Sequence, residues 1–95
     1  MSALSVFSLF VCWRIEFKYG KKLYSDSFIK NINSKLLLID NEEMEFARYF
    51  LNLNELAESC FKMILDNGIT VQNSYSVIKD NEDFNELVDI FYNES

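Results

Sequence analysis

The sequence predicts an α+β fold, in which an N-terminal β-strand or hairpin packs against two or three amphipathic helices from the C-terminal half. Apolar residues alternate with other residues between Phe7 and Tyr19, and this is the period of a strand. The second half repeats its apolar residues every three or four positions, which is the period of a helix. Because the 95 residues contain no proline and only two glycines, we expect a single domain over residues 1–95 without a linker.

The predicted N-terminal strand covers residues 6–19, where every second residue is apolar. The residues between them are apolar or small as far as Cys12 and mostly charged afterwards. We therefore expect the first half of the strand to be buried on both faces and the second half on one. A helix over residues 3–10 is the alternative for the start of the chain. The sequence YGKK at 19–22 predicts a turn, with a second strand at 23–24 completing a hairpin.

Two shorter segments follow the predicted turn. Ser25 or Asp26 is suited to cap a short helix, because small polar side chains accept hydrogen bonds from the first helical N–H groups. Residues 36–39 (LLLI) form an apolar run bounded by polar residues. Such a run fits a third strand at the centre of the sheet, or else a buried helix.

The C-terminal half predicts three helices with recognisable ends. The first begins at Asp40, and the second begins at Asn52 and ends at Gly68, which is suited to a left-handed C-cap. The third helix begins after Asp80 and carries four acids in its first half. Residues 69–78 fit either a small hairpin or a short helix capped by an asparagine.

Charge is distributed unevenly along the chain, whose net charge is −6. Residues 1–40 contain six basic and three acidic residues, whereas residues 41–95 contain three basic and twelve acidic ones. The two parts therefore carry +3 and −9. An acidic surface keeps a small domain in solution, and it also complements a basic partner.

The composition excludes most catalytic chemistry. There is no histidine, which removes the usual general base and the Ser-His and Cys-His pairs. The two cysteines, Cys12 and Cys60, lie in apolar segments and cannot form a four-ligand zinc site. We expect both thiols to be buried, unpaired and unreactive, because burial raises a thiol pKa. We therefore predict no enzymatic activity, no cofactor and no metal.

The apolar run from Ala3 to Trp13 is the only candidate for a targeting segment. It has 11 residues, whereas a membrane-spanning helix needs about 20. No basic residue precedes it, as one would in a signal peptide. We interpret the run as buried structure and expect a cytoplasmic protein. The frequent use of Asn, Lys, Ile, Phe and Tyr indicates an AT-rich genome, as in phages and mobile elements.

The leading hypothesis is a non-enzymatic protein-binding module of the small inhibitor, immunity or adaptor type. Its acidic helices would bind a basic surface of another protein, in one version by imitating the phosphates of a nucleic acid. The residues predicted to bind the partner are Glu42, Glu45, Glu82, Asp83, Glu86 and Asp89.

Two alternatives come from other functional classes. Single-stranded nucleic acid could stack and pair with an aromatic and basic N-terminal strand, through Trp13, Lys18, Lys21 and Lys22. The acidic second half makes nucleic acid the less favoured partner. The other alternative is a homo-oligomeric structural subunit, in which residues 3–13 would pair with those of a second copy.

Overall fold

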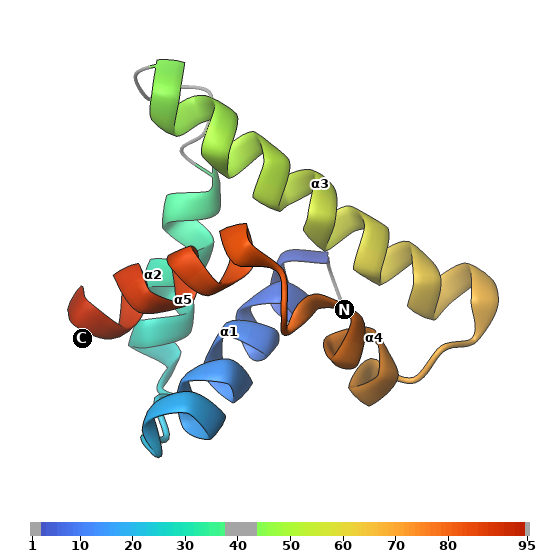
Figure 1. Cartoon of the computed structure of the whole chain (residues 1–95), viewed down its shortest axis with the longest axis horizontal. Coiled ribbons are helices and arrows are strands. Elements are labelled where there is room, and N and C mark those ends of the chain that lie inside the picture. The colour runs from blue at the N-terminus through green and yellow to red at the C-terminus, as the bar shows by residue number, and fades with distance from the viewer. Residues whose placement is uncertain (1–2, 38–43, 95) are drawn as a thin grey trace.

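The computed structural model describes residues 3–37 and 44–94, and these residues form five helices and no strand (Figure 1). The predicted α+β fold is therefore wrong. The alternative of a helix at the start of the chain is correct, and this helix extends to residue 19. In chain order the helices are α1 (Ala3–Tyr19), α2 (Asp26–Leu37), α3 (Met44–Asn67), α4 (Val71–Ile78) and α5 (Glu82–Glu94).

Helix α1 is the centre of the core, because it packs against α2, α3 and α5 (Figure 1). At 100° per residue, its buried side chains between Val6 and Cys12 cover about two thirds of the helix circumference. A helix that is apolar on most sides is the one that its neighbours surround. The buried residues in this stretch are Val6, Phe7, Ser8, Phe10, Val11 and Cys12.

The surrounded position of α1 explains why its alternating pattern was misleading. A helix with neighbours on most sides accepts apolar residues at any spacing, so the period no longer distinguishes helix from strand. The charged residues that alternate in sequence do not share a face. Arg14 and Lys18 donate hydrogen bonds to α5, whereas Glu16 accepts one from the hydroxyl of Tyr24.

Gly20 ends α1, so the predicted hairpin at residues 19–24 does not form. Its φ of 69° is a left-handed conformation that glycine adopts without steric cost, and its N–H donates to the carbonyl of Glu16 at 2.8 Å. Ser25 then caps α2, because its Oγ accepts a hydrogen bond from the N–H of Phe28 at 3.2 Å. This confirms one of the two predicted caps.

The predicted third strand is also absent where it can be checked. Residues 36 and 37 are the last two of α2, whereas residues 38 and 39 lie outside the described residues. Asp40, the predicted start of the next helix, lies outside them as well.

Helix α3 replaces two of the predicted helices. Its 24 residues correspond to about 36 Å, which equals the longest dimension of the molecule. Asn52 lies inside α3 and begins no helix. Gly68 ends α3 with a φ of 64°, and the N–H of Ile69 donates back to the carbonyl of Met63, so the predicted C-cap is confirmed.

The last two helices begin at caps that the sequence analysis misplaced. Residues 71–78 form α4, and its cap is Thr70, whose Oγ1 accepts a hydrogen bond from the N–H of Asn73. Helix α5 is capped by Asn81 and not by Asp80, because the Asn81 Oδ1 accepts from the N–H of Phe84 at 3.0 Å. Helix α5 was predicted and α4 was one of two alternatives, but neither capping residue was predicted.

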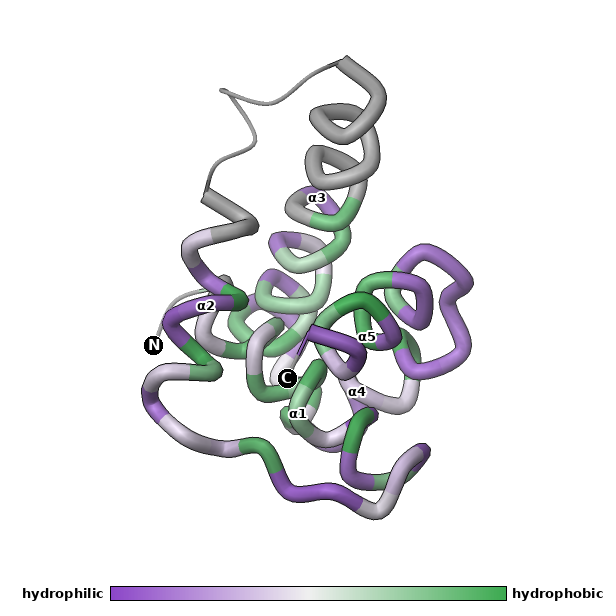
Figure 2. The backbone as a smooth tube through the Cα atoms, turned by 90° about the vertical axis from the view of Figure 1, so that its left-hand side faces the viewer, coloured by the Kyte–Doolittle hydropathy of each residue, from purple (hydrophilic) through white to green (hydrophobic). Residues whose placement is uncertain are grey.

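Aromatic contacts and two buried hydroxyls connect the helices. Phe7 of α1 meets Phe84 of α5 edge to face, with ring centroids 5.6 Å apart. The buried Ser8 hydroxyl donates to Asn33 of α2, and the buried Ser74 hydroxyl donates to the carbonyl of Cys60. Both hydroxyls are therefore satisfied, as buried polar groups must be. Along α3 and α5, hydrophobic and hydrophilic residues alternate at helical spacing, as expected for helices with one buried face (Figure 2).

The two thiols, those of Cys12 and Cys60, are buried and unpaired, as predicted. Burial raises the pKa of the Cys12 thiol to about 11, and it also raises that of Cys60 against the opposing effect of the Ser74 hydrogen bond. Among the described residues, no helix combines the length and the apolar character that crossing a membrane requires.

Candidate functional site

The outer face of α5 gathers most of the acids that the sequence singled out. Glu82, Asp83 and Glu86 are exposed, and they lie on the same side of the helix as the exposed Ile90 and Glu94. The opposite side of α5 is buried in the core. We use the term outer face of α5 for these five residues. The 13 residues of α5 contain no lysine or arginine.

Asp89 does not belong to this surface. Its Oδ1 accepts hydrogen bonds from the Nζ of Lys18, at 2.8 Å, and from the hydroxyl of Tyr19. The bond from Lys18, and after it the bond from Tyr19, holds the pKa of the Asp89 carboxyl below its usual value. Asp89 therefore connects α5 to the end of α1 through a partly exposed contact within the chain.

The other two predicted partner-binding acids cannot be placed on the outer face. Glu42 lies outside the described residues. Glu45 is in α3, and its side chain lies outside the described part of the chain. The structure thus brings together three of the six predicted residues, Glu82, Asp83 and Glu86, and adds Ile90 and Glu94 to them.

The lysines proposed to bind nucleic acid each lie beside a group of this chain. Lys18 is paired with Asp89, and Lys21 lies over the ring of Tyr92, with Nζ 5.9 Å from its centroid. Lys22 Nζ is 3.9 Å from Glu16 Oε1. These contacts neutralise or occupy the positive charges that a phosphate backbone would need.

Two of the aromatic residues near these lysines are engaged in different places. Tyr19 stacks on Tyr92 of α5, with centroids 3.8 Å apart and ring planes at 1°. Trp13 is half-buried on the side of α1 that faces α4, where it meets Tyr75 edge to face at 5.4 Å. The structure therefore does not bring Trp13, Lys18, Lys21 and Lys22 together on one surface.

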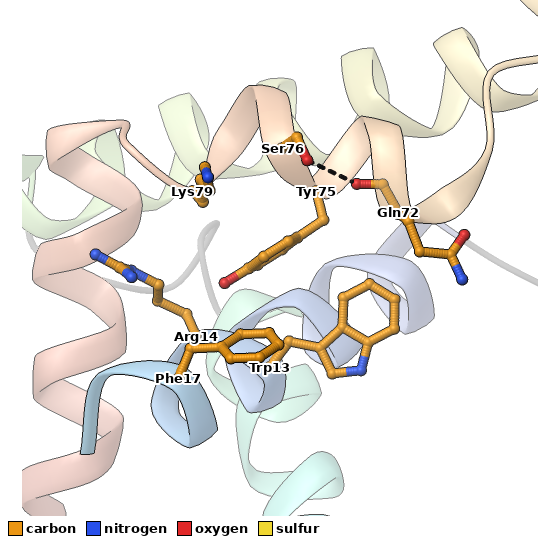
Figure 3. A pocket seen from close by; sticks show the side chains of 7 residues that line it. All are labelled: Trp13, Arg14, Phe17, Gln72, Tyr75, Ser76 and Lys79. Carbon is orange, nitrogen blue, oxygen red and sulfur yellow. Dashed lines mark hydrogen bonds between the residues drawn. The ribbon is translucent and has the colours of Figure 1, made fainter. Parts of the chain in front are cut away.

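A groove lies between α1 and α4 (Figure 3). It has a volume of about 470 Å³. Helix α1 contributes residues at positions i, i+1 and i+4, and α4 contributes residues at i, i+3, i+4 and i+7, so one face of each helix lines it. The lining residues are Trp13, Arg14 and Phe17 from α1, and Gln72, Tyr75, Ser76 and the C-cap residue Lys79 from α4 and its end.

Three rings form the apolar part of this α1–α4 groove. Tyr75 is only 8% exposed and contacts the other two, with its centroid 5.4 Å from that of Trp13 and 6.2 Å from that of Phe17. Phe17 is 71% exposed. The groove thus presents a large aromatic surface to solvent, although such side chains are usually covered.

The polar end of the groove is held by a side chain of α5. The Nε of Arg14 donates to the Oδ1 of Asn85 at 2.9 Å, and the Nδ2 of Asn85 donates to the backbone carbonyl of Lys79 at 2.8 Å. Asn85 therefore connects the side chain of Arg14 to the backbone of Lys79. The hydroxyl of Tyr75 points towards Arg14 (Figure 3). Burial raises the pKa of Tyr75, and the neighbouring Arg14 guanidinium opposes that shift.

Sequence analysis missed the groove because it left residues 69–78 undecided between hairpin and helix. A helical interpretation would have placed Gln72, Tyr75, Ser76 and Lys79 on one face.

Within the described ranges, no three Cys, Asp or Glu side chains lie close enough together to hold a metal ion. No family model matches the sequence, and neither curated proteins nor solved structures gave a match to it.

Proposed function

We propose that the chain is a non-enzymatic protein-binding module, of the small inhibitor, immunity or adaptor type, that docks the outer face of α5 on a basic surface of its partner. The observation that carries the proposal is the composition of this face. Four exposed acids surround one exposed isoleucine on a helix that has no basic residue.

Two features of the outer face support docking rather than solvation alone. Glu82 and Glu86 pair with no cation of the described residues, so their charge is available to a partner. Ile90 is 40% exposed in the middle of these charges, although an acidic helix needs no apolar residue to remain in solution. A charged rim around an apolar contact is the usual arrangement of a protein interface.

The proposed binding residues differ from those expected from the sequence alone. Asp89 is excluded because its carboxylate is already bonded to Lys18 and Tyr19. Ile90 and Glu94 are included because they share the outer face. If the protein imitates a nucleic acid, duplex DNA or RNA should also compete with it for binding to the partner.

The homo-oligomer alternative was motivated by an exposed apolar patch, and the structure does not support that patch. That alternative requires residues 3–13 to be exposed in a single copy, but most of their described side chains are buried. The cytoplasmic location remains part of the proposal. The two buried, unpaired thiols support it, because small domains in oxidising compartments commonly carry disulfides.

The experiment compares the protein with the variant E82Q/E86Q, which removes two charges from the outer face without altering the core. Each tagged protein captures partners from a lysate of the cells that express it, at low and at moderate salt, and mass spectrometry identifies them. The affinity of the purified partner is then measured against salt concentration.

We expect the unchanged protein to retain a basic partner that E82Q/E86Q loses at moderate salt, together with a shallower salt dependence in the variant. The matched control is E55Q/E58Q, which removes two exposed charges from α3. The control should bind as the unchanged protein does. If E82Q/E86Q and E55Q/E58Q bind the partner equally well at every salt concentration, the outer face of α5 is not the interface.

A further inference from the structure

We propose that the α1–α4 groove binds a small ligand in which a planar ring carries one phosphate monoester, as in a mononucleotide. This site is separate from the outer face of α5. The proposal is based on two rings, Trp13 and Phe17, and two cations, Arg14 and Lys79, that line the groove.

The anion-binding end consists of Arg14 and Lys79. Arg14 is bonded through Nε to a neutral amide, and Lys79 is exposed and has no acidic partner among the described residues. Two such cations at one end are unusual in a chain with 15 acids and only nine basic residues. Their combined charge matches the charge of about −2 on a phosphate monoester at neutral pH.

Asn85 makes this end a preorganised site. It holds the guanidinium of Arg14 with its carbonyl oxygen and the backbone of Lys79 with its amide nitrogen. Arg14 also hydrogen-bonds the hydroxyl of Tyr75, and its remaining N–H groups are the donors for phosphate oxygens, which arginine binds through paired hydrogen bonds. The cost of ordering Arg14 is therefore met before a ligand arrives.

The ring-binding part of the groove consists of Trp13 and of Phe17, which lies beside Arg14 (Figure 3). Phe17 is exposed for 71% of its surface, so a planar ring could cover it without displacing any protein group. Stacking of a base on such a side chain stabilises a complex by about 1–3 kcal/mol. The amide of Gln72 lies beside Trp13 at this end and offers a donor and an acceptor to the edge of a heterocycle (Figure 3).

Size and charge favour a small ligand over a nucleic-acid strand. The volume of about 470 Å³ is in the range of small-molecule sites. The exposed Asp80 follows Lys79 in the chain and its charge acts on the hydroxyl of Tyr75, so it opposes a ligand with several phosphates more strongly than one with a single phosphate. The net charge of −6 opposes a polyanion in the same way.

The test uses Trp13, the single tryptophan, as the reporter. Its fluorescence and its indole N–H signal in NMR spectra are followed during titration with four probes: AMP, adenosine, inorganic phosphate and a short oligodeoxyadenylate. We expect AMP to bind with a Kd below about 1 mM and at least about tenfold more tightly than adenosine or phosphate, because only AMP engages both ends.

Two substitutions of exposed residues distinguish the ring contact from the anion contact. Phe17→Ala should weaken AMP binding about tenfold through lost stacking. Lys79→Gln should weaken AMP binding about fivefold and leave adenosine binding unchanged, because only the charge-assisted contact is lost. The matched controls are Leu65→Ala, which removes an apolar side chain that is 66% exposed, and Lys30→Gln, which removes an exposed cation of α2. Neither control should alter binding.

Several outcomes would overturn the proposal. An unchanged Trp13 signal up to about 5 mM AMP would remove the site altogether. Equal binding of AMP and adenosine, or of AMP and phosphate, would show that the groove recognises only one half of the proposed ligand. An oligodeoxyadenylate that binds more than about tenfold tighter than AMP would identify a strand as the ligand. Equal weakening by the controls would place binding elsewhere.

Discussion

The Nζ of Lys18 lies 2.8 Å from the Oδ1 of Asp89, and this contact connects the end of α1 to α5 across 71 positions of sequence. It shows that the basic and acidic parts of the chain neutralise each other in part within one molecule. The charge that remains for a partner is therefore smaller than the sequence indicates. On α5 it is concentrated on the outer face.

We predict that Asp89→Asn destabilises the protein at neutral pH and much less in acid. The exposed fractions of the two side chains, 34% for Lys18 and 41% for Asp89, limit the loss at pH 7 to about 0.5 kcal/mol. The pKa of Asp89 is lowered on folding, so its contribution is present above the ordinary value of 3.8 and disappears as the pH falls through the folded value. Urea unfolding of both proteins at neutral and acidic pH measures the difference.

The variant Glu86→Gln is the control for this experiment, because Glu86 is an exposed acid of the same helix that pairs with no cation of the described residues. Its effect on the free energy of unfolding should be near zero at pH 7. A loss of stability in Asp89→Asn that is the same at every pH would contradict the ion pair.

Helix α5 offers a direct test of which residue caps it. Asn81→Ala should lower the free energy of unfolding by about 1 kcal/mol, because the N–H of Phe84 loses its acceptor. Asp80→Ala, one residue earlier, should change it by less than about 0.5 kcal/mol. Thermal or urea unfolding of the two variants decides the matter, and a larger effect of Asp80→Ala would restore the sequence-based prediction.

The buried thiols predict slow chemical labelling. Cys12 is 0% and Cys60 1% exposed, and burial raises the pKa of Cys12 from 9.0 to about 11. The raised pKa alone reduces the thiolate fraction of Cys12 about a hundredfold at pH 8. Labelling with an aromatic disulfide reagent should therefore be at least about a hundredfold slower in the native protein than in urea. Rapid reaction of either thiol in the native state would show that the core is not closed as described.

Helix α5 and the C-terminal part of α3 could be predicted because each has one buried face, whereas α4 was left undecided between hairpin and helix. In α5 the spacing of Phe84, Leu87, Val88 and Phe91 determined the helix, and Gly68 marked the end of α3. The caps were less certain, because Asp80 and Asn81 are both suitable capping residues and their sequence spacing does not distinguish them.

Helix α1 could not be predicted because the spacing of its apolar residues does not show how many neighbouring helices surround it. Its residues are apolar on most sides, and only contacts with α2, α3 and α5 show that the segment is surrounded. The α1–α4 groove was missed for the same reason. Trp13 and Phe17 were expected on one face of a strand beside the lysines, but in a helix they face α4 while Lys18 meets α5.

The α1–α4 groove requires α1 to be a helix packed against α4. The ion pair between Lys18 and Asp89 requires the same helix to pack against α5. NMR spectroscopy tests this most directly, through sequential amide NOEs over residues 7–19 and NOEs between the rings of Trp13 and Tyr75. We predict helical amide NOEs throughout this range and clear ring contacts, because the two centroids are 5.4 Å apart. Extended-type chemical shifts over residues 7–19, with no NOE between Trp13 and Tyr75, would contradict the fold and both proposals that depend on it.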